Sequence, residues 1–226
     1  YIKNNNELVH ELHPIICNYL GIKKAWFISH HYAHSLSTWM IENKEPDISI
    51  IIDGLGDGRP WSIFRNDKLI DYGDIEKGSV GWAIRDAGKL LNINCIHQND
   101  IAGKLMGLQS YGNLDKDYEK LLSIYSMEDA NNIFNFNTWY KYKGNDLLAK
   151  YTCLDWIKTV HSYTGKSIVN FFKKYANKND IISYSGGVAQ NVIWNTLLKK
   201  EFPTVQFLDP ADDVAKKISK ILSCAT

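Results

Sequence analysis

Two histidines and one aspartate have the residue types and the spacing of a metal site. His30 and His34 are four residues apart, so on a helix both imidazoles would lie on one face. The apolar run before them, residues 25–28, predicts a buried strand. Asp53 follows a strongly β-forming run, residues 48–52, and the sequence indicates no structural role for it. Two histidines and a carboxylate with open positions are typical of Fe(II) sites. Two exposed or hydrogen-bonded histidines at a helix start would have the same spacing.

The glycine-rich turn after the second strand is a candidate phosphate-binding loop. Residues 53–58 read Asp-Gly-Leu-Gly-Asp-Gly, and Gly54 and Gly56 would let backbone N–H groups approach an anion closely. The carboxylates of Asp53 and Asp57 would repel a phosphate unless a metal cation lay between them. An acidic turn of a β-hairpin is the alternative interpretation.

A second glycine pair lies at a predicted strand-to-helix junction. Gly186 and Gly187 come between an expected buried strand over residues 180–184 and an expected helix over residues 188–199. The N-terminus of a helix with no side chains in the way can bind an anion or a nucleotide. Asn191, one turn further, could donate to a base or a ribose. Close packing of the strand on the helix is the structural alternative.

The remaining pattern predicts the elements that must position these residues. Helical spacing is expected over residues 7–20, 80–91, 117–125 and 152–176, and residues 48–52, 61–65 and 69–72 predict a three-stranded meander with a tight turn at 66–68. Residues 127–150 are polar and aromatic, which indicates a loop or a short insertion.

Composition excludes several classes of function. A net charge of +1 provides no overall attraction to nucleic acid or to an anionic membrane. No apolar run approaches the roughly 20 residues that a membrane-spanning helix needs. The four cysteines are scattered and form no C-x-x-C pair, which favours reduced thiols and a cytoplasmic location.

Four stretches, in order and with matching spacing, resemble the O-carbamoyltransferases that act on nodulation factors and antibiotics. They match that family's HHxAH element, its strand-DGxGD turn, its GKxMGLxxYG block and its SGGVAxN block. In this sequence they are residues 30–35, 52–58, 103–112 and 185–191. Without the resemblance, residues 103–108 would be an unremarkable loop, since they lack the spacing of a P-loop.

The resemblance implies an α/β domain of the actin/Hsp70/sugar-kinase type, a fold shared with the tRNA threonylcarbamoyl transferase. His30, His34 and Asp53 would bind Fe(II) or another divalent metal near the phosphates of ATP, which enters with Mg as co-substrate. His31 would be either the base that takes the proton of the acceptor hydroxyl or a residue that orients the metal ligands. The nucleotide would be bound by Gly54, Gly56, Lys104, Gly186, Gly187 and Asn191.

The implied reaction moves a carbamoyl group from carbamoyl phosphate, through a carbamoyl-adenylate made from ATP, onto a hydroxyl. The acceptor would be a small molecule, a sugar or a hydroxymethylated base, and only the last of these would make nucleic acid a partner. A non-catalytic nucleotide-binding module and a tRNA threonylcarbamoyl transferase-like enzyme are the alternatives.

The sequence departs from the family at both ends. The family begins with a strand and a hairpin before the position of Tyr1, and no D-x-G element follows residue 207. We therefore expect a metal- and ATP-binding domain over residues 1–207, incomplete at its N-terminus, and a tail over 208–226 related to the family's YrdC-like domain. Without a complete YrdC-like domain, this chain alone is expected to be inactive on carbamoyl phosphate.

Overall fold

The computed structural model describes residues 8–116, apart from 43–44, 76–77, 91–92, 94 and 99, and residues 153–207. The predicted segments 117–125, 127–150 and 208–226 lie outside these ranges. Within them, no helix is both long enough and apolar enough to cross a membrane.

A five-stranded mixed sheet forms the centre of the fold, in the order β5-β4-β3-β6-β7. The strands β3 (Ile48–Gly56), β4 (Arg59–Arg65) and β5 (Lys68–Tyr72) form an antiparallel meander. On the other side of β3, the strands β6 (Ile182–Ser185) and β7 (Gln206–Phe207) continue the sheet in parallel. The predicted α/β class is confirmed.

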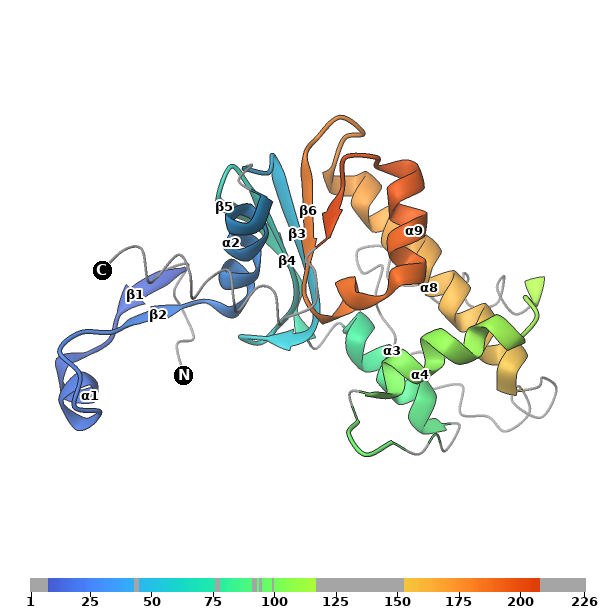
Figure 1. Cartoon of the computed structure of the whole chain (residues 1–226), viewed down its shortest axis with the longest axis horizontal. Coiled ribbons are helices and arrows are strands. Elements are labelled where there is room, and N and C mark those ends of the chain that lie inside the picture. The colour runs from blue at the N-terminus through green and yellow to red at the C-terminus, as the bar shows by residue number, and fades with distance from the viewer. Residues whose placement is uncertain are drawn as a thin grey trace.

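Helices cover both faces of this sheet (Figure 1). Helix α2 (His30–Glu42) lies on one face, and α8 (Cys153–Tyr175) and α9 (Val192–Glu201) lie on the other. Helices α3 (Val80–Leu90) and α4 (Asp100–Leu108) pack together beyond one end of the sheet.

The alternation of β3 divides its side chains between the two faces. Ile48, Ile50 and Ile52 join the main hydrophobic core, which the side chains of α8 help to form. Ile51 points to the α2 face, where its register neighbours Ser62 and Ser185 bond to α2. A residue at position 53 on this strand therefore faces the histidines of α2.

Two predictions for the chain before α2 are only partly confirmed. In place of a helix over 7–20, strand β1 (Val9–Glu11) pairs with β2 (Trp26–Ile28), and only α1 (Pro14–Tyr19) is helical. Pro14 stands in the first turn of α1, where its missing N–H costs no hydrogen bond.

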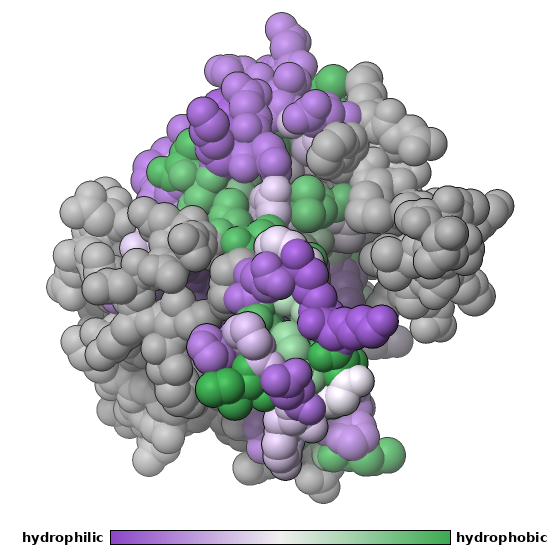
Figure 2. Space-filling view, turned by 90° about the vertical axis from the view of Figure 1, so that its left-hand side faces the viewer, coloured by the Kyte–Doolittle hydropathy of each residue, from purple (hydrophilic) through white to green (hydrophobic). Residues whose placement is uncertain are grey.

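Strand β2 was expected to be buried, but all three of its residues are exposed. It belongs to a separate two-stranded sheet, which projects from the body as an arm (Figure 1). Figure 2 views the molecule from this end, where hydrophobic side chains lie among hydrophilic ones.

The other predicted elements are largely confirmed. The turn at 66–68 places Asn66 and Asp67 at φ values of 48° and 60°, as a tight hairpin requires. Residues 103–108 are not a loop, because they lie within α4. The helix expected from residue 188 begins at Val192, after a 3₁₀ turn (Gly187–Gln190), because Asn191 leaves helical geometry to cap α9.

Candidate metal centre and cavity

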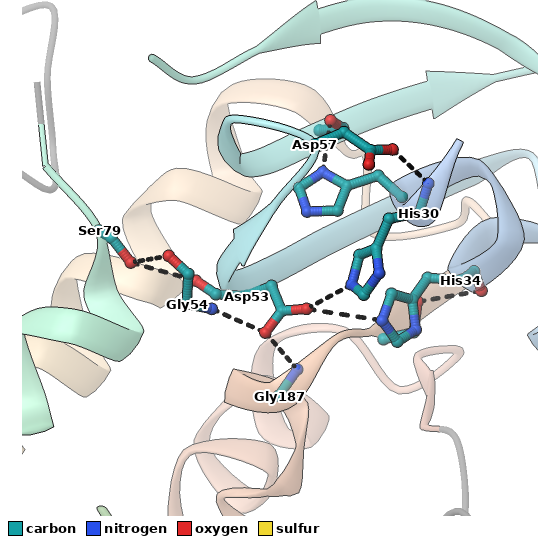
Figure 3. A network of polar contacts seen from close by, with 10 residues as sticks. His30, His34, Asp53, Gly54, Asp57, Ser79 and Gly187 are labelled. Carbon is teal, nitrogen blue, oxygen red and sulfur yellow. Dashed lines mark hydrogen bonds and ion pairs between the residues drawn. The ribbon is translucent and has the colours of Figure 1, made fainter. Parts of the chain in front are cut away.

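The structure brings the three predicted metal ligands together at the end of β3 (Figure 3). His30 Nε2 lies 2.9 Å from Asp53 Oδ2, and His34 Nε2 lies 3.5 Å from the same oxygen. The two imidazoles come from consecutive turns of α2, as the four-residue spacing predicts. Three donor groups thus converge on one point.

Asp53 also has a structural role that the sequence did not indicate. Its Oδ1 accepts hydrogen bonds from the backbone N–H groups of Gly54, at 2.7 Å, and Gly187, at 3.3 Å. Burial acts to raise the pKa of the Asp53 carboxyl, but hydrogen bonds from His34, His30 and the Gly54 amide outweigh it and hold the pKa well below its usual range. The carboxylate is therefore ionised at any ordinary pH, as a metal ligand must be.

The turn between β3 and β4 fixes the start of α2. Asp57, at φ 53°, accepts a 2.5 Å hydrogen bond from the backbone N–H of His30 through Oδ2. A β-carbon on Gly56 would overlap the His30 ring and would come within 2.8 Å of His31 Cδ2. Gly56, predicted to bind nucleotide, lies instead against the imidazoles of the metal cluster.

His31 is buried under the cluster, with 1% of its surface exposed. Its Nδ1 lies 2.7 Å from Ser62 Oγ, and its Nε2 has no hydrogen-bond partner among the residues that the structure describes. Burial, and then the neighbouring His30, lower the pKa of His31 to about 4, so its ring is neutral at pH 7. This burial favours the orienting role over that of a base reached by an acceptor hydroxyl.

A cavity of about 620 Å³ opens beside Asp53. Four of the predicted residues, Asp53, Gly54, Gly187 and Asn191, line it, and so does Gly103 of the GKxMGLxxYG block. Lys104 is exposed on α4, and it is not among the residues that line the cavity. Three segments therefore meet at this cavity: the glycine-rich turn at 53–58, the glycine pair at 186–187 and the block at 103–112.

Gly186 allows the chain to pack closely against β3. Close packing was the alternative to an anion- or nucleotide-binding role for this glycine pair. Its φ is +93°, and a β-carbon there would overlap the carbonyl oxygen of Ile52. The chain can pass from β6 into the 3₁₀ turn against β3 only with glycine at this position. This approach places the N–H of Gly187 next to Asp53.

Asn191 lines the cavity, but most of its amide is already engaged. Its Oδ1 accepts from the N–H groups of Ile193 and Trp194, each at 3.2 Å, which caps α9. Its Nδ2 lies 2.8 Å from Nε2 of His161, a buried residue of α8. One N–H of the amide remains for the predicted contact with a nucleoside.

Helix α3 lines one side of the cavity with residues that include Trp82 and Arg85, and none of them was predicted from the sequence. Ser79 Oγ donates to the carbonyl oxygen of Gly54, at 2.6 Å, and accepts from the N–H of Trp82, which ties α3 to the end of β3. A β-carbon on Gly81 would come within 2.8 Å of Gly54 Cα, so glycine allows the close approach. A serine before a helix with a glycine in its first turn was the available signal.

The buried His161 predicts an acid-dependent loss of stability. Burial, and then Lys158, lower the pKa of His161 to about 4, so the unfolded chain binds a proton between pH 6.5 and 4 that the folded chain does not. Stability should therefore fall as pH falls through this window, by on the order of 3 kcal/mol from this residue.

Urea unfolding at pH 7 and at pH 4.5 measures this effect. His161→Gln, which keeps an amide oxygen near Asn191, should show a smaller loss than the unaltered chain. His31 has a similarly lowered pKa, so part of the pH dependence should remain. Equal losses in the two proteins would contradict the prediction.

Comparisons with known proteins give limited matches. No family model matches the chain. Glutamate–tRNA ligase 2 of Campylobacter jejuni subsp. doylei is 32% identical over 121 residues, and glutamate–tRNA ligase 1 of Campylobacter jejuni (strain RM1221) is 33% identical over 121 residues. Each alignment covers 51% of this chain and 26% of the ligase, so the chain spans about a quarter of these relatives' length. Such partial matches do not place the chain in the ligase family.

One solved structure, the activator of 2-hydroxyisocaproyl-CoA dehydratase from Clostridium difficile with bound ADPNP, aligns with a TM-score of 0.47 and 14% identity. The alignment covers 77% of this chain and 59% of the activator chain. At these values the likeness does not assign a function.

Proposed function

We propose that this chain is the metal- and nucleotide-binding part of an ATP-dependent O-carbamoyltransferase. The observation that carries the proposal is the convergence of the four resembling blocks. Asp53 contacts His30 and His34 from one block and the N–H of Gly187 from another. Gly103, of the remaining block, lines the cavity that begins at Asp53.

The donor set suits a divalent transition metal such as Fe(II). Imidazole nitrogens and a carboxylate oxygen are its usual ligands, and the histidines and Asp53 already lie at contact distance. The buried His31 Nε2 without a partner also fits a site that is meant to hold a cation. When bound, the metal would polarise an oxygen of the phosphate or of the carbamoyl group.

The cavity suits the nucleotide. Backbone N–H groups of Gly54 and Gly187 donate to the Asp53 carboxylate beside the cavity, and they would become available to phosphate oxygens when that carboxylate turns to a metal ion. The indole rings of Trp82 and Trp194 and the side chain of Val188 provide apolar wall for a nucleoside. Mg would accompany ATP as a co-substrate, and the protein would act in the cytoplasm.

In the proposed transfer, the carbamoyl carbon leaves the phosphate oxygen of carbamoyl-adenylate and bonds to the acceptor oxygen. AMP departs with the bonding electrons of the broken C–O bond, and the proton of the acceptor hydroxyl passes to solvent water. A non-catalytic module would bind the nucleotide through the same cavity without this bond exchange.

We expect carbamoyl phosphate to be bound and cleaved by a separate YrdC-like domain. Recognition of this dianion favours several arginines, and the whole sequence has three, Arg59, Arg65 and Arg85. We therefore expect the 226-residue chain to bind ATP but to release no phosphate from carbamoyl phosphate. Adding a separate YrdC-like domain should restore the release and the transfer.

The assay is phosphate release from carbamoyl phosphate by the purified chain, with and without that domain. Robust turnover by the chain alone would contradict the division of labour. ATP binding with no transfer even when the YrdC-like domain and candidate acceptors are present would favour the non-catalytic module.

A further inference from the structure

We propose that His31 is a fourth protein ligand of the metal, beside His30, His34 and Asp53. The inference rests on the metal site of the proposed function and adds a donor that the spacing of His30 and His34 did not indicate. It also assigns Ser62 as the residue that positions the His31 ring.

The first observation is the unpartnered nitrogen. His31 is almost completely buried, and its Nε2 makes no hydrogen bond with any described residue. A buried polar atom without a partner is costly, and native proteins rarely leave one without a reason. A metal ion between His31 and Asp53 would provide the missing partner.

The second observation is distance. The candidate donor atoms of His30, His31 and Asp53 all lie within 4.8 Å of one another. Donors on one ion with bonds of about 2.1 Å are at most about 4.2 Å apart. Small movements of the side chains would therefore bring these three donors into one coordination sphere, and His34 Nε2 lies 3.5 Å from Asp53 Oδ2.

The third observation is the orientation of the ring. Ser62 Oγ lies 2.7 Å from His31 Nδ1 and can accept a hydrogen bond from the Nδ1–H group. When Nδ1–H donates to Ser62 Oγ, Nε2 carries the lone pair, and metal-bound histidines are commonly held in this way.

A site with three imidazoles and one carboxylate prefers different metal ions from a site with two imidazoles and one carboxylate. The added nitrogen favours Zn²⁺, Fe²⁺ or Co²⁺ over Mg²⁺, whose preferred ligands are oxygens. With four protein donors, a six-coordinate ion would keep two positions for oxygens of a phosphate or a carbamoyl group.

The test is Co²⁺ binding to the full chain, followed by calorimetry and by the visible absorption of the bound ion. We expect His31→Gln to weaken Co²⁺ binding at least tenfold and to change the absorption band. Ser62→Ala should weaken binding by about tenfold, and Ser62→Thr, which keeps the hydroxyl, should restore it. His97→Gln, an exposed histidine away from the cluster, is the matched control.

Unaltered affinity and absorption in folded His31→Gln would overturn the inference. If that variant does not fold, unchanged affinity and absorption in Ser62→Ala would overturn it instead. Failure of the unaltered chain to bind Co²⁺, Fe²⁺ or Zn²⁺ would reject the proposed metal site itself, which is a different result.

Discussion

Alanine at position 30 or 34 is expected to remove the bound metal while the fold survives. Each substitution deletes one imidazole that contacts Asp53 Oδ2. Neither side chain belongs to the hydrophobic core, so the cost to stability should be small. Loss of one ligand of four or fewer should weaken binding by at least about 100-fold.

Elemental analysis of iron and other transition metals after purification measures this result, and circular dichroism checks the fold. His97→Ala is the control, because it removes an exposed histidine outside the cluster. Metal content equal to that of the unaltered chain in both the His30 and His34 variants would contradict the metal site.

The second large effect is expected at Gly187, where valine should abolish measurable ATP binding. The β-carbon of any substituent would come within 2.9 Å of Asp53 Oδ1, and the branches of valine would fill the mouth of the cavity. The backbone N–H of Gly187, which donates to Asp53 Oδ1 in this structure, would no longer be reachable by a phosphate. We expect a loss of affinity of about 100-fold or more, equivalent to about 2.7 kcal/mol.

Calorimetric titration with ATP measures the change. Gly107→Val is the size-matched control, since no described atom lies within 4 Å of a β-carbon at that helical position. A folded Gly187→Val chain with unaltered affinity for ATP would place the phosphate site elsewhere.

The metal cluster was predictable because its geometry is mostly local. The spacing of His30 and His34 sets their shared face once α2 forms, and Asp53 stands at the end of a strand that the β-branched run makes unmistakable. The parallel pairing of β3 with β6 then brings Asp53, at the start of the first glycine-rich segment, next to Gly187 of the second. Only the meeting of α2 with this edge of the sheet required the tertiary structure.

The parts that could not be predicted depend on contacts between distant segments. The burial of His31 arises from packing of α2 on β4 through Ser62, which is 31 residues away in the sequence. Asn191 was predicted to bind a nucleoside, but its use as a cap is decided by where α9 begins. The arm was mispredicted because the apolar run at 25–28 has the composition of a buried strand although β2 is exposed.

The pairing of a metal site with a nucleotide site in this one chain is tested most directly by titrating ATP into the metal-loaded protein. Calorimetry should show saturable binding of one ATP per chain, and Gly187→Val should remove it. A folded chain that has bound its metal and gives no heat with ATP would contradict the proposed function.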